Sequence, residues 1–250
     1  MGLLKPAVIV VTGAFHKPDH YHSLKVKLEA RGYEVFIPLL ASCSSQVGIT
    51  WKDDVALIHK TVEPHMDDGK EFIVICHSYG GLPGCAATSG FTAEERKNSD
   101  KKGGFRAILF MAAFAVPQAG MDILQCLGGK YPSWMTHQPL YQRNKTCFVN
   151  DKAKQDLYND LPDDIAGKCF DTLLPFSQDA LETPAEFVAS DLTIPRTFLI
   201  CENDMAMLLH IQETLVAGTS GMKVERCSAG HSPFISQPDR VVEVIEGLIE

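Results

Sequence analysis

The sequence predicts an α/β fold with a mostly parallel β-sheet and helices on both faces. Three observations predict it. Short apolar runs rich in β-branched residues recur along the chain, and each has the composition of a strand buried on both faces. Helical patterns separate these runs, and such alternation is typical of a parallel sheet with helical crossovers. Polar residues that could carry chemistry follow several of the runs, at the edge where open α/β sheets bind ligands.

The first half of the expected core follows this alternation closely. Residues 7–13 form a β-branched run that ends in glycine, as expected for a buried strand. Residues 20–32 have apolar side chains at helical spacing before a glycine stop, and residues 33–40 resume a strand pattern. Residues 51–69 predict an amphipathic helix that ends near Pro64, because proline disrupts a helix interior.

The remaining core elements repeat the pattern. Residues 71–76 and 105–114 are apolar runs of strand length. Residues 196–204 and 223–230 predict two more strands, and each run ends in polar residues. Residues 240–250 have apolar positions at helical spacing and predict a closing helix.

Two segments interrupt the alternation. Residues 91–104 are charged and end in glycine, so we expect a solvated surface insertion. Residues 117–194 lack a long buried strand and contain the patterns of short helices. We therefore expect a helical cap at 117–194, inserted between core strands of a single α/β unit that is formed by residues 1–116 and 195–250.

Length and composition limit the classes of function. A chain of 250 residues with 45% hydrophobic residues can bury one large core. Its net charge of −8 argues against a nucleic-acid or anionic-membrane partner. No apolar run reaches membrane-spanning length and no signal-peptide cleavage region follows the start, so the expected localisation is cytoplasmic. We expect a small-molecule substrate and no cofactor; the oligomeric state stays open, with a homodimer as one option.

Neither the cysteines nor the histidines indicate a metal site. The eight cysteines are scattered and form no CxxC pair, which favours buried, reduced thiols over a disulfide scaffold. The segment HKPDHYH, residues 16–22, superficially suggests metal ligands, but no further ligand cluster supports it. We expect these histidines to cap a helix or to lie in solvent.

The stretch VICHSYGG, residues 74–81, predicts a nucleophile at Ser78. It follows an apolar strand and leads into a helix rich in small residues at 80–90, which is the strand–turn–helix context of a nucleophile elbow. Gly80 supplies the small residue two positions after the serine. Cys76 stands where this turn normally has glycine, and it is small enough to be tolerated.

A serine hydroxyl needs a general base, and the base needs an orienting carboxylate. The chain supplies both in the order serine, acid, histidine that goes with this type of elbow. Asp204 ends one strand-like run and His231 follows another, so both are expected at the ligand-binding edge of the sheet. Glu202 is a rival for the acid, but it lies closer to the strand interior.

The oxyanion of an acyl-transfer reaction needs two preorganised N–H groups. We expect one from Tyr79, the residue after the serine. We expect the other from the loop after the first strand, from Ala14 or alternatively Phe15, where Gly13 permits a close approach of the loop.

Taken together, these motifs resemble the α/β-hydrolase superfamily. Within it, the chain is similar to the compact branch of plant salicylate methyl esterases and hydroxynitrile lyases, and it looks closest to small fungal hydrolases. The resemblance spans about residues 7–245, in the motifs VVTGAFHKPDHY, WKDDVALIHKTVEP, VICHSYGGLPG, FLICEND and AGHSPFISQPDRV. It implies an α/β-hydrolase fold and agrees with a triad and two oxyanion donors at Ser78, Asp204, His231, Ala14 and Tyr79.

The chain also departs from the family pattern. Thr12 replaces the histidine that usually precedes the glycine of the first loop. The lyases of this branch carry threonine where Gly13 stands, and a lysine where Ser232 follows the histidine. That lysine stabilises the departing cyanide, so its absence argues against a hydroxynitrile lyase.

The sequence therefore predicts a serine hydrolase that cleaves an ester, lactone or thioester of a small, largely apolar molecule through an acyl-enzyme. Two alternatives stay open. The same fold and triad could perform C–C cleavage, elimination or cyclisation in secondary metabolism, or the protein could be a ligand receptor with slow or no turnover. Each candidate substrate-binding residue could equally be ordinary core packing; the candidates are Phe15, Trp134, His137, Met205, Met207 and Phe234.

Overall fold

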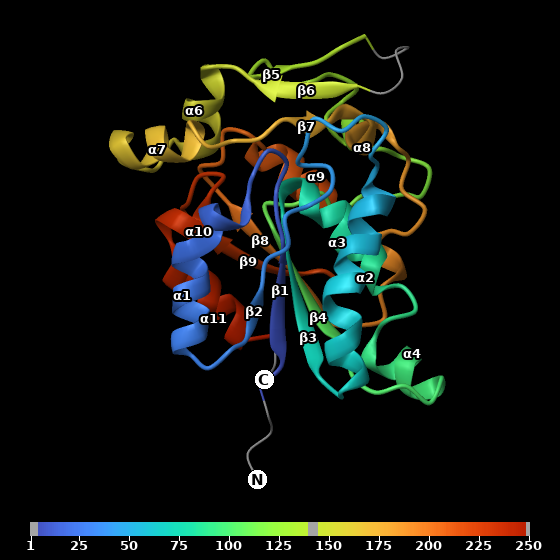
Figure 1. Cartoon of the computed structure of the whole chain (residues 1–250). Helices are drawn as coiled ribbons and strands as arrows, with labels where there is room; N and C mark the ends of the chain where they lie inside the picture. The colour runs from blue at the N-terminus through green and yellow to red at the C-terminus, as the bar shows by residue number, and fades with distance from the viewer. Residues whose placement is uncertain (1–4, 140–144, 249–250) are drawn as a thin grey trace.

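Six parallel strands form the central sheet of the protein (Figure 1). The computed structural model describes residues 5–139 and 145–248. The strand order is β2-β1-β3-β4-β8-β9. The strands are β1 (Ala7–Val11), β2 (Val35–Phe36), β3 (Glu71–His77), β4 (Gly104–Met111), β8 (Arg196–Cys201) and β9 (Lys223–Cys227). The sheet confirms the predicted α/β-hydrolase fold class.

Helices cover both faces of this sheet and bury two separate apolar clusters (Figure 1). Alternate residues of the inner strands face opposite clusters, as the pleat requires, so that Ile9 packs on one face and Val8 on the other. One face is covered by α2 (Trp51–Asp67), α3 (Gly81–Thr88) and α9 (Leu209–Ala217). The other is covered by α1 (His22–Ala30), α10 (Pro233–Ser236) and α11 (Pro238–Glu246).

The bounds of two core elements differ from the prediction. Strand β2 keeps only two residues of the expected run 33–40, because Pro38 has no N–H to donate to a neighbouring strand. Helix α2 continues beyond Pro64 to Asp67. The fully buried Met66 packs on the core in this last turn, and that contact favours the helical turn despite the proline.

Residues 91–104 form a surface insertion, as expected, in which most charged side chains are exposed. They contain α4 (Ala93–Asn98), which begins with a capping box between Thr92 and Glu95. Arg96 in this helix is 1% exposed, and its guanidinium lies 2.5 Å from the Asp67 carboxylate. The buried Arg96 side chain therefore attaches α4 to the end of α2 through the exposed carboxylate of Asp67.

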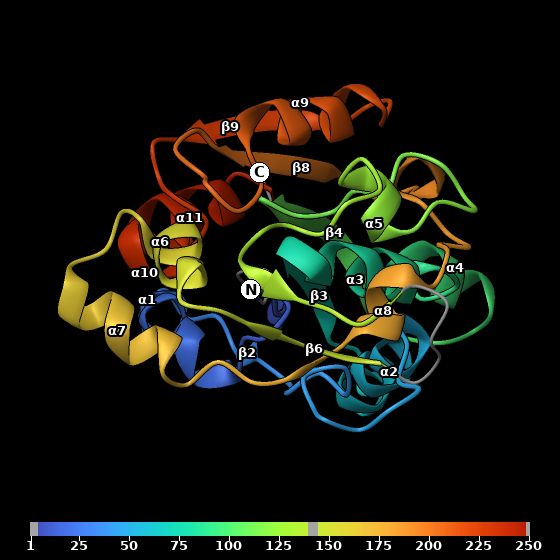
Figure 2. The ribbon, with the colours of Figure 1, turned by 90° about the horizontal axis from the view of Figure 1, so that it is seen from above.

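The segment 117–194 lies over the carboxyl ends of the strands (Figures 1 and 2). It contains short helices, as expected, at α5 (Ile123–Cys126), α6 (Lys152–Tyr158), α7 (Asp163–Phe170) and α8 (Gln178–Glu182). It also contains a small antiparallel sheet of β5 (Met135–Thr136), β6 (Thr146–Val149) and β7 (Phe176–Ser177), so it is not purely helical. Strands this short leave no readable periodicity in a sequence.

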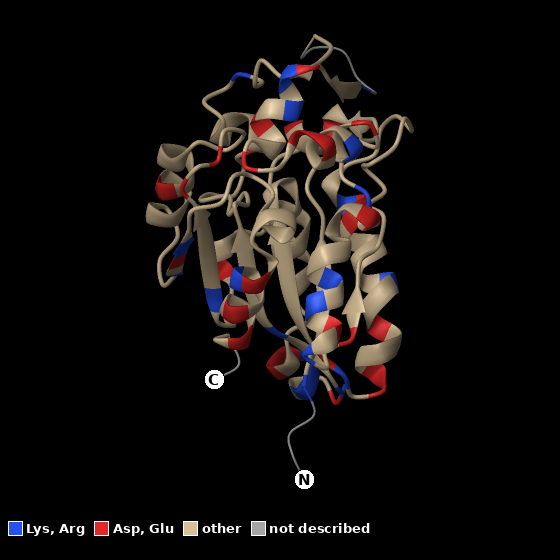
Figure 3. Ribbon diagram, turned by 90° about the vertical axis from the view of Figure 1, so that its left-hand side faces the viewer, with Lys and Arg blue, Asp and Glu red and all other residues tan. Residues whose placement is uncertain are grey.

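Charges of both signs are intermixed over the outer helices and loops, and the central strands are almost free of them (Figure 3). In the described part of the chain, we find no helix with the length and hydropathy needed to cross a membrane. The turns η1 (Pro18–Tyr21), η2 (Ser78–Gly80) and η3 (Ala189–Asp191) complete the secondary structure.

Candidate active site

Ser78 occupies a strained turn between β3 and α3. It is the first residue of η2 and has a φ of 50°, in the left-handed region that non-glycine residues rarely adopt. The turn directs the chain from the buried strand into the helix, and Ser78 stays partly accessible where its flanking residues are buried. This is the geometry of a nucleophile elbow.

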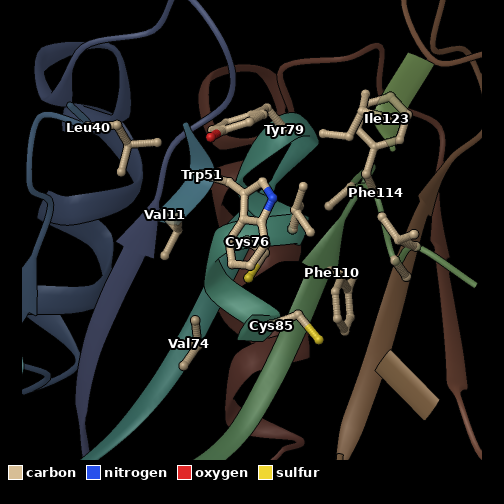
Figure 4. Packing of buried hydrophobic residues seen from close by; sticks show 14 of the residues in the cluster. Val11, Leu40, Trp51, Val74, Cys76, Tyr79, Cys85, Phe110, Phe114 and Ile123 are labelled. Atoms are coloured by element: carbon tan, nitrogen blue, oxygen red, sulfur yellow. The ribbon is translucent and has the colours of Figure 1, made fainter. Parts of the chain in front are cut away.

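Cys76 fits this elbow because the facing helix leaves room for it. The Cys76 side chain is fully buried between the sheet and α3 (Figure 4). A Cβ atom on Gly84 of α3 would lie only 2.3 Å from the Cys76 sulfur, so the missing side chain at position 84 makes space for the thiol. Burial raises the pKa of the Cys76 thiol well above its usual value, which keeps it protonated and makes it a poor nucleophile.

The side chains of Asp204 and His231 form a buried pair. The Asp204 carboxylate accepts a hydrogen bond from His231 Nδ1 over 2.7 Å, and both side chains are at most 3% exposed. Its second oxygen accepts the backbone N–H groups of Ala206 and Met207, each at 2.8 Å. The rival Glu202 is exposed and pairs with Arg226. These contacts fix the carboxylate and leave Nε2 of the imidazole as the free nitrogen.

Ser78 and His231 line the same cavity. Among the hydrogen bonds of residues 5–139 and 145–248, none joins the Ser78 hydroxyl to the imidazole. Catalytic hydrogen bonds are often long in unliganded enzymes and tighten when substrate is bound. The structure thus brings the three predicted triad residues to one site, with the acid–base contact already formed.

Ala14 and Tyr79 also line this cavity. Ala14 belongs to the loop after β1, and Tyr79 follows Ser78 in the elbow. Tyr79 lies in the first turn after β3, where helical N–H groups have no partner within the helix. Phe15 does not line this cavity, so it is a poorer donor candidate than Ala14.

A buried carboxylate that the sequence analysis did not identify holds Tyr79 in place. The Tyr79 hydroxyl donates to Asp54 over 2.6 Å, and the other Asp54 oxygen accepts the backbone N–H of Ser42 at 3.0 Å. Burial raises the pKa of Asp54. A signal was present in the sequence, since Asp54 falls at helical spacing in line with Trp51 and Ile58, on the apolar face of α2.

The cavity encloses about 460 Å³ of space that the protein atoms leave empty, and part of this space is open to solvent. No Lys, Arg, Asp or Glu side chain is among the described residues that line it. The Tyr131 hydroxyl donates a hydrogen bond to the Glu182 carboxylate over 2.7 Å. The lining comprises Ala14, Ser78, Tyr79, Phe114, Ile123, Leu124, Leu127, Tyr131, Pro132, Trp134, Met135, Leu181, Ala206, Met207 and His231.

Two of the six expected substrate-binding residues line the cavity, namely Trp134 and Met207. The other four do not. Phe15 is fully buried behind Trp134, with the ring centroids 6.0 Å apart. His137 is exposed and stacks on the outer side of the segment against Tyr131, with centroids 4.5 Å apart.

Met205 and Phe234 are the remaining two corrections. Met205 is 44% exposed and lines an adjoining surface groove, which shares part of its wall with the cavity. Phe234 is fully buried and stacks on Tyr21 with ring centroids 4.1 Å apart. Adjacency to a triad residue in the sequence therefore did not predict which side chains face the cavity.

Among residues 5–139 and 145–248, no group of three or more His, Cys, Asp or Glu side chains that could hold a metal ion is found, including in the segment 16–22. We expected the histidines of this segment either to cap a helix or to lie in solvent. His16 and His20 are buried, so neither lies in solvent. His20 does cap the turn η1, since its Nδ1 accepts the Lys17 N–H at 3.0 Å. His16 Nδ1 donates to the Ala14 carbonyl over 2.8 Å, and its Nε2 accepts the Tyr158 hydroxyl at 3.0 Å.

The fold and this constellation define a class of protein, the α/β hydrolases. A sequence profile of the alpha/beta hydrolase family matches residues 8–244, and the chain belongs to this family. It is 31% identical over 248 residues to alpha/beta hydrolase nvfD of Aspergillus novofumigatus, which covers 97% of this chain and 96% of that protein. Membership of the family and this fungal relative agree with the resemblance read from the motifs.

Solved structures share the fold over almost the whole chain. Polyneuridine aldehyde esterase superposes with a TM-score of 0.77 at 15% identity, over 98% of this chain and 100% of that one. A pyrethroid hydrolase from Sphingobium faniae JZ-2 superposes with a TM-score of 0.72 at 19% identity, over 97% of this chain and 96% of that one.

Proposed function

We propose that the protein is a serine hydrolase that cleaves an ester, lactone or thioester of a small, neutral, largely apolar molecule. The proposal rests on one observation. Ser78, in its strained turn, and His231, which is hydrogen-bonded to Asp204, line the same apolar cavity. Membership of the alpha/beta hydrolase family, and the esterase and hydrolase names of related structures, support hydrolysis as the general chemistry.

In the proposed mechanism, the Ser78 hydroxyl attacks the acyl carbon while Nε2 of His231 takes its proton. Asp204 holds the imidazole by its Nδ1–H and stabilises the imidazolium that forms. The Ala14 and Tyr79 N–H groups stabilise the oxyanion. His231 then returns the proton to the leaving alcohol or thiol, and a water molecule activated by the same imidazole releases the acid.

The position after the histidine supports hydrolysis over cyanohydrin chemistry. Ser232 is fully buried and its hydroxyl donates to the Leu157 carbonyl over 2.9 Å, so it presents no positive charge to the cavity. Non-hydrolytic chemistry on the same triad and a slow receptor are the alternatives that the experiments must separate from hydrolysis.

The uncharged lining predicts a preference for neutral acyl groups. We expect p-nitrophenyl butyrate to be cleaved with a kcat/KM at least about 100-fold above that of mono-p-nitrophenyl glutarate, because an unpaired carboxylate buried in this lining costs several kcal/mol. Steady-state kinetics of the purified protein measure this ratio, with Ser78→Ala as the background control. An equal or higher kcat/KM for the anionic ester would contradict the proposed substrate class.

A further inference from the structure

His77, the residue before the candidate nucleophile, joins three parts of the site. It is the last residue of β3 and is fully buried. Its Nε2 lies 2.9 Å from the backbone carbonyl oxygen of His231, and its Nδ1 lies 2.7 Å from the Tyr21 hydroxyl. The same hydroxyl accepts the backbone N–H of Gly13 at 2.9 Å. The ring therefore turns away from the cavity and has hydrogen-bond partners of its own.

If the His77 imidazole is neutral, only one assignment of donors and acceptors fits the hydrogen bonds from Gly13 to the His231 carbonyl. A carbonyl oxygen can only accept, so Nε2 of His77 carries the proton. Nδ1 is then an acceptor, and the Tyr21 hydroxyl must donate to it. The Tyr21 oxygen in turn accepts from Gly13. Every polar atom in the run from Gly13 through Tyr21 and His77 to the His231 carbonyl is satisfied in this direction.

The surroundings of the His77 ring favour its neutral form. The titratable groups that face the ring are Tyr21 from η1, His16 from the loop after β1, and His231 from the loop after β9. Burial holds the pKa of His77 well below its usual value, and the two neighbouring imidazoles act in the same direction.

The loop that carries Ala14 also rests directly on this ring. A Cβ atom on Gly13 would lie 2.6 Å from His77 Nδ1 and 3.2 Å from the Ser78 Cβ. Only glycine therefore fits between the loop and the elbow. Phe234 closes the arrangement from α10, since it stacks on Tyr21 and lies 4.8 Å from the His77 ring.

We propose that His77 is a positioning residue, which fixes the backbone of His231 directly and the oxyanion loop through Tyr21 and Gly13. This inference rests on the proposed hydrolase function. It assigns the catalytic histidine two restraints: Asp204 orients its ring, and His77 anchors its main chain. The single residue before the nucleophile thus sets the distance between the base, the serine and one oxyanion donor.

The variants Tyr21→Phe, His77→Gln and His77→Leu test the assignment, with Tyr33→Phe as the matched control. Tyr33 is a buried tyrosine whose hydroxyl has no hydrogen-bond partner, so its removal costs no such contact. For each protein we would measure kcat and KM on p-nitrophenyl butyrate and the rate at which a fluorophosphonate labels Ser78. Circular dichroism establishes that each variant is folded.

We expect Tyr21→Phe to lower kcat and the labelling rate by about 10- to 100-fold with little change in KM, because a small displacement of the oxyanion loop acts on the transition state. His77→Gln keeps an uncharged donor and acceptor and should retain most of the activity. His77→Leu removes both hydrogen bonds and should lose at least as much as Tyr21→Phe. Tyr33→Phe should stay within about twofold of the wild type.

Unchanged kcat in Tyr21→Phe, or a loss in Tyr21→Phe that Tyr33→Phe reproduces, overturns the positioning role. Equal losses in His77→Gln and His77→Leu overturn it as well. If His77→Leu fails to fold, the comparison of Tyr21→Phe with Tyr33→Phe still decides the matter. Failure of the hydrolase function is a separate result, because wild-type protein would then neither label nor hydrolyse the ester.

Discussion

Replacing Asp204 with asparagine is expected to lower kcat by roughly 10³- to 10⁴-fold without unfolding the protein. The asparagine oxygen can still accept the Ala206 and Met207 N–H groups that now bind the carboxylate. Its NH₂ group then faces Nδ1 of His231 in place of the carboxylate oxygen. The imidazole must accept this hydrogen bond, so its proton moves to Nε2, where the lone pair is needed to take the proton of Ser78.

The matched control for this substitution is Glu202→Gln. Glu202 lies two residues earlier, is exposed, and pairs with Arg226 on the surface. Exposed ion pairs contribute little, so this change should leave kcat within about twofold. Steady-state kinetics on one ester compare the two variants. Wild-type turnover in Asp204→Asn, or a large loss in Glu202→Gln, would show that the acid is assigned to the wrong residue.

The second large effect is a loss of stability in mild acid. Burial lowers the pKa of His16 and His77 well below 6.5. The unfolded chain then binds protons on these residues that the folded protein does not, so the free energy of unfolding falls as the pH drops below about 6.5 and stops falling only near the folded pKa. Two such histidines correspond to about 3 kcal/mol between pH 6.5 and pH 5.

Asp54 acts in the opposite direction, in the pH range between the usual pKa of a carboxyl group and its own raised folded-state pKa. Burial raises its pKa, so its contribution to stability is present at low pH and is lost as the pH rises through the folded-state pKa. The contribution of one histidine is therefore best isolated by substitution. Urea unfolding at several pH values should show a slope that is smaller in His77→Gln by up to about 1.4 kcal/mol per pH unit.

The control for the pH experiment is His22→Gln, since His22 is exposed on α1. Its slope should match that of the wild type. A free energy of unfolding that is constant between pH 6.5 and pH 5 in the wild type would contradict the presence of neutral, buried histidines. An identical slope in His77→Gln and the wild type would contradict the assignment to His77.

The sequence was sufficient to predict the central sheet because its strands are buried on both faces. The run 72–76 has no polar position, and such a composition is typical of a strand that is buried on both faces. The triad candidates were found for a related reason. Chemistry in open α/β sheets collects at the carboxyl ends of strands, so strand-end serine, aspartate and histidine could be identified without knowledge of their distances.

The cavity lining could not be predicted in the same way. Side chains next to the triad in sequence, such as Met205 and Phe234, turn outward or into the core according to turn geometry. The lining instead comes mostly from the segment 117–194, whose short elements have no periodicity. The polar supports of the site were also missed, because the contacts of Asp54 and His77 join residues that are distant in the sequence.

The most direct test of the proposed function is to map the site of fluorophosphonate modification by peptide mass spectrometry, alongside turnover of p-nitrophenyl butyrate. A serine hydrolase with this triad should be labelled stoichiometrically at Ser78, lose labelling in Ser78→Ala and His231→Ala, and hydrolyse the ester. Wild-type protein that resists labelling, with His231→Ala behaving identically, would contradict the account. Labelling at Ser78 without turnover of any short acyl ester would instead favour a receptor or a narrow non-hydrolytic role.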